Sequence, residues 1–120
     1  MTLPMPKRVP KVGFYYHYKH NPEDATNPVG NYAYEFLSVG FHTEDDARPG
    51  EEHFVNYRPL YKDAAVYKAS LELGVPCIDN RPLEMWMGDV VVKGETIPRF
   101  RLITDPAIIE QLEKIRSEMY

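Results

Sequence analysis

The chain has 120 residues, of which 43% are hydrophobic and 27% charged, and its formal net charge is −4. This composition is that of one globular domain and excludes a disordered chain. The acidic balance extends over both halves of the chain, which removes most of the electrostatic support for nucleic-acid binding, so we expect no nucleic-acid partner.

The N-terminal residues and the single cysteine bear on location. Cys77 has no partner for an intramolecular disulfide and fits a reducing compartment. The segment MTLPMPKRVPK has no apolar run behind its basic residues, so it does not resemble a signal peptide. No stretch is long enough to span a membrane. We therefore predict a cytoplasmic protein without a membrane association.

The first half of the chain predicts an arm and three strands. Three prolines prevent a helix over 1–11, which is expected to be extended. Aromatic and β-branched residues predict strands over 12–20, 32–41 and 53–61. The strand 32–41 is expected to be central, because both of its faces are largely apolar. Its alternating side chains form two sets: Tyr32, Tyr34 and Phe36 on one face, and Ala33, Leu37, Val39 and Phe41 on the other.

The second half begins with a helix. Asp63 can cap a helix over 63–74 that ends at Gly74. Its buried stripe is expected to consist of Val66, Ala69, Ser70 and Leu73. Beyond extended chain at 76–81, a single turn over 82–87 is expected to place Leu83 and Trp86 on the core.

The chain then returns to strands and ends in a second helix. Residues 90–103 predict a hairpin that turns at Lys93-Gly94. Asp105-Pro106 is a good helix start, and the helix 105–119 follows. Its apolar stripe is Ile108, Ile109, Leu112, Ile115 and Met119. Together these elements predict a mainly β fold with added helices, a small and strongly bent sheet or barrel. The sequence has no βαβ alternation, no GxGxxG motif and no P-loop motif, so we expect no bound cofactor.

Five segments of the chain resemble, in order, the bacterial domain of unknown function numbered 1653. They are Tyr15-Tyr16-His17-Tyr18-Lys19, Tyr34-Glu35-Phe36-Leu37, Val55-Asn56-Tyr57-Arg58-Pro59-Leu60-Tyr61, Ile78-Asp79-Asn80-Arg81-Pro82-Leu83-Glu84-Met85-Trp86 and Val92-Lys93-Gly94-Glu95-Thr96-Ile97-Pro98-Arg99-Phe100. The resemblance covers 12–103 and implies an SH3-like β-roll domain, preceded by the arm 1–11 and followed by the helical segment 104–120. It implies no activity. Family members have a short turn after the Tyr-Arg-x-Leu-Tyr strand, whereas this chain has the predicted helix 63–74 there. We therefore interpret the helix as an insertion.

The histidines and the cysteine are weak candidates for metal binding or nucleophilic catalysis. His17 and His20 are three residues apart, so on a strand they face opposite sides, and we predict no metal site. The position of His17 in the family pattern raises it to a candidate site residue. Cys77 lies between Pro76 and Ile78 and resembles a small hydrophobic residue.

Three arginines adjacent to prolines, Arg58, Arg81 and Arg99, allow two interpretations. Two of them share the tripeptide Arg-Pro-Leu. In the first interpretation, they form structural ion pairs with carboxylates, for which the candidates are Glu35, Asp63, Asp79 and Glu84. In the second, they line a cationic pocket with aromatic walls that binds a phosphate, a carboxylate or a nucleotide. The predicted ligand-binding residues are His17, Lys19, Tyr57, Arg58, Tyr61, Arg81, Glu84 and Arg99.

The predicted function is that of a non-enzymatic binding module for a small anionic ligand or a protein partner. One alternative is an enzyme acting on a small phosphorylated or nucleotide substrate, with His17 as general base oriented by Glu35 or Glu84. Another is a purely structural role, for example as a homodimer. An SH3-like fold could also offer a groove for a proline-rich peptide, and the candidate aromatic residues for it are Tyr15, Tyr16, Tyr18, Tyr32 and Tyr34.

Overall fold

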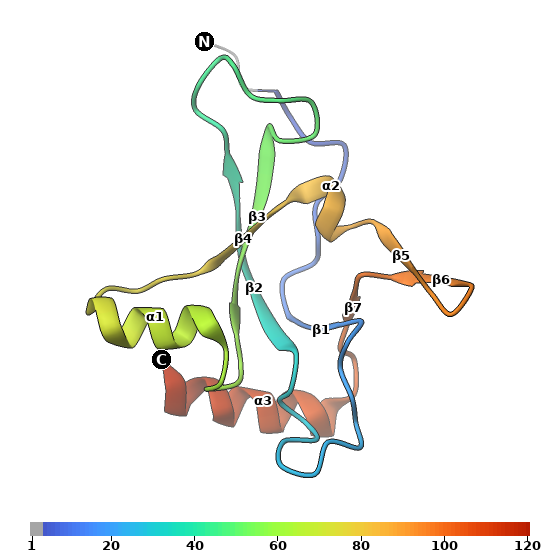
Figure 1. The fold of residues 1–120 in the computed structure, drawn as a ribbon, viewed down its shortest axis with the longest axis vertical. Helices are drawn as coiled ribbons and strands as arrows, with labels where there is room; N and C mark the ends of the chain where they lie inside the picture. Colours follow the sequence, from blue (N-terminus) through green and yellow to red (C-terminus); the bar gives the residue numbers. More distant parts are fainter. Residues whose placement is uncertain (1–3) are drawn as a thin grey trace.

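Within residues 4–120, which this computed structural model describes, seven strands form two antiparallel sheets accompanied by three helices (Figure 1). In chain order, the elements are β1 (Phe14–His17), β2 (Ala33–Phe41), β3 (His53–Pro59), α1 (Ala65–Leu73), β4 (Asp79–Pro82), α2 (Leu83–Trp86), β5 (Asp89–Val92), β6 (Glu95–Pro98), β7 (Phe100–Leu102) and α3 (Pro106–Met119). The predicted mainly β fold with added helices is confirmed. None of the helices in the described range is long and apolar enough to cross a membrane.

The large sheet is open, so of the two predicted alternatives, a bent sheet or a barrel, the structure has the sheet. Its strand order is β4-β3-β2-β1-β7, which leaves β4 and β7 as edges and puts β2 in the centre, as predicted. The chain runs from β4 directly into α2, and the next two strands, β5 and β6, pair with each other in a separate small sheet. As a result, within 4–120 no strand connects the two edges of the large sheet.

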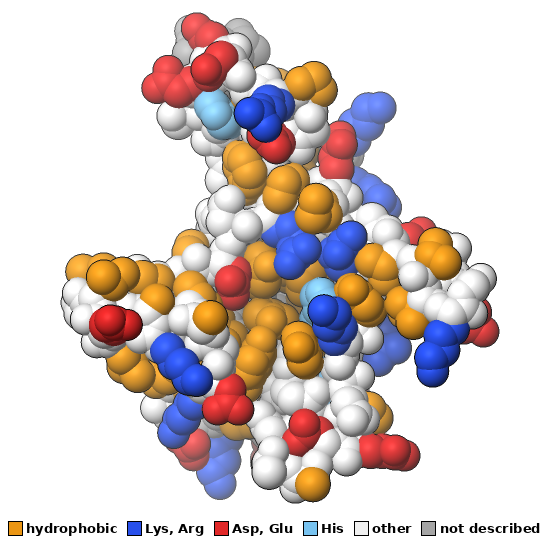
Figure 2. Space-filling model, viewed as in Figure 1, with side chains coloured by type: hydrophobic (Ala, Val, Ile, Leu, Met, Phe, Trp, Pro, Cys, Tyr) orange, Lys and Arg blue, Asp and Glu red, His pale blue; other side chains and the backbone are white. Residues whose placement is uncertain are grey.

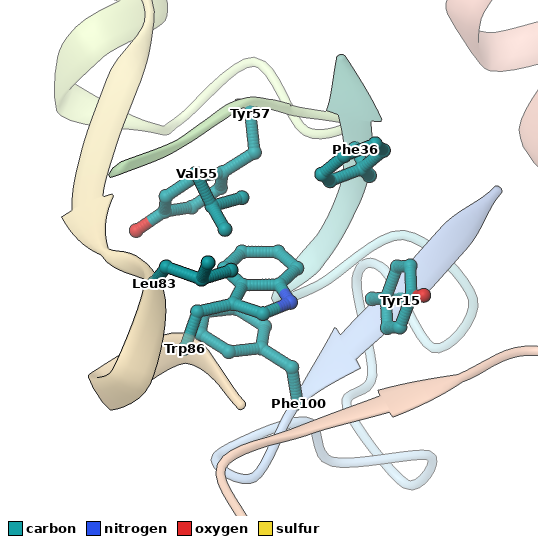
Figure 3. Packing of buried hydrophobic residues seen from close by; sticks show 7 residues of the cluster. All are labelled: Tyr15, Phe36, Val55, Tyr57, Leu83, Trp86 and Phe100. Carbon is teal, nitrogen blue, oxygen red and sulfur yellow. The ribbon is translucent and has the colours of Figure 1, made fainter. Parts of the chain in front are cut away.

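One face of the large sheet carries an aromatic core (Figure 3). Its buried members are Tyr15, Phe36, Val55, Tyr57, Leu83, Trp86 and Phe100. Trp86 stacks on Phe100 with ring centroids 3.6 Å apart, and burying a side chain of this size contributes about 2–3 kcal/mol. The prediction that a single turn places Leu83 and Trp86 on the core is confirmed by α2.

The opposite face of the sheet is covered by α3. The buried members of this second core are Phe14, Tyr16, Ala33, Leu60, Ile103 and Leu112. Ile108, Ile109 and Ile115 of the predicted stripe pack against them. The predicted start of α3 is also confirmed, because the Asp105 carboxylate accepts a hydrogen bond from the Ala107 N–H and Pro106 is the first helical residue.

Helix α1 lies beside the sheet rather than over one of its faces (Figure 1). Gly74 ends it in the left-handed conformation, with φ 73°, as predicted, but the residue before the helix is Ala64, and no side chain caps it. The prediction that Asp63 is the cap is therefore wrong. The predicted buried stripe is also wrong: no residue of α1 is buried, and Leu73 is 67% exposed, because the helix does not lie over a face of the sheet.

A bulge in β2 changes which side chains share a face. The register with β3 shifts between Phe36 and Ser38, and the extra residue reverses the alternation beyond it. Val39 therefore packs against the same core as Tyr34 and Phe36, whereas strict alternation predicted the opposite face.

Two other local predictions are confirmed. The β5–β6 hairpin turns at Lys93 and Gly94, whose φ angles of 51° and 80° suit a two-residue turn. The described part of the N-terminal arm, residues 4–11, contains no helix or strand. It is attached to β3, because His53 Nε2 donates a hydrogen bond of 2.7 Å to the Pro4 carbonyl. Residues 1–3 of the predicted arm lie outside the described range.

Candidate functional site

The aromatic face of the large sheet is covered by α2 at one end only. Cross-strand partners point to the same face, so the pairings Tyr57 with Asp79 and His17 with Phe100 place these four side chains on the aromatic face. Arg81 shares this face because it stands two residues after Asp79. In Figure 2, Lys, Arg and His side chains gather at the centre of the molecule, between the α1 lobe and the β5–β6 lobe.

His17 lies at the end of β1 and is 9% exposed. Its Nδ1 atom accepts a hydrogen bond of 3.2 Å from the Lys19 backbone N–H, so in the neutral ring the proton is on Nε2. Burial, followed by the positive charges of Arg81, Lys19 and Arg99, lowers the pKa of His17 to about 4. Neutral His17 can therefore donate a hydrogen bond from Nε2 to a ligand at pH 7.

Arg81 rests on aromatic rings and has no carboxylate partner. Its Nε donates to the Tyr57 hydroxyl at 3.2 Å, its Nη1 to the Met85 sulfur at 3.6 Å, and its guanidinium lies 5.6 Å from the centre of the Phe100 ring. No carboxylate oxygen of residues 4–120 lies within 4.0 Å of it. Since a guanidinium has five N–H groups, three remain for an anion.

Arg99 is a second cation whose charge, like that of Arg81, lowers the pKa of His17 and acts on Tyr57. Its backbone is fixed on both sides, because its N–H donates to the Gly88 carbonyl and its carbonyl accepts from the Tyr18 N–H. The side-chain Nε is buried without a hydrogen-bond partner in the described part of the chain. A buried donor without an acceptor costs about 1–3 kcal/mol. We name His17, Lys19, Arg81 and Arg99 the basic cluster.

Four tyrosines beside the basic cluster form what we name the tyrosine wall: Tyr32, Tyr34, Tyr57 and Tyr61. The Tyr34 and Tyr61 hydroxyls are 2.5 Å apart, and burial raises the pKa values of Tyr34, Tyr57 and Tyr61. Tyr32 has a φ of 53°, which is strained for a bulky residue and is typical of functional sites. Its ring stacks over His17 with centroids 5.6 Å apart.

Asp79 also lies on the aromatic face. The sequence suggested it as an ion-pair partner of the arginines and not as a ligand-binding residue. It is half-buried on β4, and burial raises the pKa of its carboxyl although Arg81 opposes the shift. Its carboxylate accepts no hydrogen bond and forms no ion pair with any residue that the structure describes. The alternation of β4, which puts Asp79 and Arg81 on one face, was a signal for their proximity.

Arg58 is not part of the site, although it was predicted to be. It points to the opposite face of β3 from Tyr57, where its Nε donates to Glu35 Oε1 at 2.8 Å. Arg116 of α3 donates to the other oxygen of Glu35 at 2.6 Å. The ring of Tyr120 lies 3.9 Å from the Arg58 guanidinium. Of the two Arg-Pro-Leu copies, Arg58 therefore forms a structural ion pair, whereas Arg81 forms none among residues 4–120.

Of the remaining predicted residues, Tyr57, Tyr61 and Lys19 lie at the site and Glu84 does not. Lys19 is exposed at the rim, with its Nζ 6.0 Å from the Tyr18 ring. Glu84 lines a groove of about 430 Å³ beneath residues 4–8 of the arm. A second groove, of about 440 Å³, lies beside α3. Neither groove includes a residue of the basic cluster.

Two further predictions concern the aromatic groove and metals. Tyr15 and Tyr16 cannot form a peptide groove, because they are 6% and 7% exposed and donate hydrogen bonds to backbone carbonyls. His20 is bound to the Asn31 carbonyl, with its Nδ1 2.6 Å away. Among residues 4–120, no three His, Cys, Asp or Glu side chains form a group that could hold a metal ion.

The low pKa of His17 gives a pH dependence of stability. The unfolded chain binds a proton at His17 near pH 6.5, whereas the folded protein resists protonation until about pH 4. The stability that neutral His17 contributes is therefore present above pH 6.5 and is lost as the pH falls towards 4. From pH 7.5 to 4.5 we expect a loss of about 2–3 kcal/mol. Urea unfolding should show this loss in the wild type and a correspondingly smaller one in His17→Gln; equal losses would contradict the prediction.

Comparison with protein families supports the resemblance that the sequence motifs indicated. The family model described as "Protein of unknown function (DUF1653)" matches residues 13–102. This segment extends from β1 to β7 and contains the whole basic cluster, while α3 follows it. Comparison with curated proteins and with solved structures finds no match. Because the family model covers most of the chain, the protein belongs to the DUF1653 family of proteins of unknown function.

Proposed function

We propose that this protein is a binding module for a small anionic ligand with a planar body, which it binds on the basic cluster and the tyrosine wall. The observation that carries the proposal is that the charges of Arg81 and Arg99 both act on His17, with no carboxylate within 4.0 Å of either arginine among the residues described. Like charges in proximity repel, and an anion between them removes the repulsion.

The chemistry of the cluster favours a carboxylate or a phosphate as the anionic group. Arg81 offers a planar set of N–H groups that matches such anions, and His17 adds a donor at Nε2. Tyrosine rings are suitable surfaces for a planar group.

The alternative of an enzyme with His17 as general base has less support. Glu35 is bound to Arg58 and Arg116 on the opposite face of the sheet, and Glu84 lies under the arm. A general base near its working pH is the most efficient, whereas the pKa of His17 is about 4. These observations favour a role for His17 in binding.

We also propose that the fold is an SH3-like β-roll in a bacterial, cytoplasmic protein. The short, antiparallel strands of the large sheet support the first part. The resemblance of the sequence motifs supports the bacterial origin, and the single free thiol of Cys77 supports a reducing compartment.

The proposed function is tested by NMR titration of the full chain with benzoate and with phenyl phosphate, each of which joins an anion to a ring. We expect the backbone amides of His17, Arg81, Arg99 and Phe100 to shift with either compound. The amides of Glu35 and Arg58, on the opposite face, serve as internal controls. An absence of shifts, or shifts confined to the groove beneath the arm, would contradict the proposal.

A further inference from the structure

We infer that the ligand is dipolar: its anion contacts the basic cluster, and a cationic or N–H group at its other end contacts Asp79. This inference rests on the proposed function and narrows the ligand class. It follows from a feature that anion binding leaves unexplained, a carboxylate on the same face as the cations.

Asp79 and Arg81 are close but do not form an ion pair. They are two residues apart on β4, so their Cα atoms are separated by roughly 7 Å, and their charged groups are more than 4.0 Å apart. The face therefore has a positive and a negative end.

Tyr57 of the tyrosine wall connects these two ends, because it is the cross-strand partner of Asp79 and its hydroxyl accepts a hydrogen bond from Arg81. The charge of Asp79 also contributes to the raised pKa values of Tyr34, Tyr57 and Tyr61. The Tyr57 hydroxyl binds Arg81, and the Tyr34 and Tyr61 hydroxyls bind each other. Tyr57 is 4% exposed, so the ring surface available to the middle of the ligand is that of Tyr32, Tyr34 and Tyr61, of which Tyr32 is exposed.

A half-buried carboxylate without a protein partner lowers the stability of the fold. The raised pKa of Asp79 expresses this cost, because the folded state loses stability as the pH rises through that pKa. Groups that cost stability and face an open surface are typical of binding sites. A cation or an N–H donor on the ligand would supply the missing partner.

The inference is tested with three matched compounds: benzoate, benzylamine and 4-(aminomethyl)benzoate, which carries both charges on opposite ends of one ring. In NMR titrations of the wild type, we expect 4-(aminomethyl)benzoate to bind at least about tenfold more tightly than benzoate, a difference of about 1.4 kcal/mol. In Asp79→Asn this advantage should disappear, while benzoate binds at least as tightly as before.

Asp79→Asn should also raise Tm at pH 7, because asparagine removes the charge that burial disfavours. Asp89→Asn, at an exposed position of β5, is the matched control and should change neither Tm nor the affinities. If benzoate binds but 4-(aminomethyl)benzoate binds no more tightly, the inference of a dipolar ligand is overturned and the proposed anion binding remains. The same follows if 4-(aminomethyl)benzoate still binds more tightly than benzoate in Asp79→Asn. If neither benzoate nor 4-(aminomethyl)benzoate binds, the proposed function and the inference fall together.

Discussion

Replacement of Arg81 by methionine is expected to lower the affinity for 4-(aminomethyl)benzoate by about 100-fold, with little change in stability. Loss of one charged partner of a hydrogen-bonded ion pair costs about 2–5 kcal/mol of binding free energy, and 100-fold corresponds to about 2.7 kcal/mol. Arg81 has no carboxylate partner within the described residues, and methionine can still cover Phe100. The free energy of unfolding measured in urea should therefore change by less than about 1 kcal/mol.

The chain provides its own control for this experiment in the other Arg-Pro-Leu copy. Arg58→Met should leave the affinity within about twofold but lower the free energy of unfolding by roughly 2 kcal/mol, since it leaves the Glu35 carboxylate with one partner. NMR titration and urea unfolding of both variants measure the two effects. A collapse of stability in Arg81→Met would instead assign a structural role to both arginines.

Replacement of Glu35 by glutamine is expected to lower the free energy of unfolding by about 2–3 kcal/mol. The Glu35 carboxylate is 12% exposed and joins three elements, because it accepts from Arg58 of β3 and from Arg116 of α3 while it stands on β2. Without its charge, two guanidinium groups remain close together with no anion between them. This expected loss is smaller than the loss for a fully buried group of three charges, because Arg116 is 38% exposed.

Equilibrium unfolding in urea measures this loss. Glu110→Gln, at an exposed position of α3, is the matched control and should change the free energy by less than about 0.5 kcal/mol. The double variant Glu35→Gln, Arg58→Met should be less destabilised than the sum of the two single changes, because both remove the same ion pair. Additive losses would show that Glu35 and Arg58 contribute independently.

Both predictions depend on which side of the sheet an arginine faces, and the sequence alone left this open. Arg58 and Arg81 share a tripeptide, and each was assigned either to a pocket or to an ion pair. The bulge between Phe36 and Ser38 and the pairing of β2 with β3 determine that Glu35 meets Arg58. Such long-range registers are set by the packing of the whole sheet and leave little trace in local sequence.

Local signals, in contrast, were sufficient for most elements. Proline, glycine and aspartate determine where α3 begins, where α1 ends and where the β5–β6 hairpin turns, since each acts through the backbone conformation of its immediate neighbours. The apolar spacing of α2 and α3 identified the residues that they bury. Asp63 was the exception, because a possible cap does not determine the residue at which a helix begins.

The sequence by itself determined the elements, the family motifs and the residue types available for a site, because these depend on neighbours along the chain. The tertiary structure decided which of these residues meet. It paired Glu35 with Arg116, 81 positions away, and it left Asp79, Arg81 and Arg99 without ion-pair partners among residues 4–120. Charges act through space, so the identity of a binding site depends on the fold that brings them to one face.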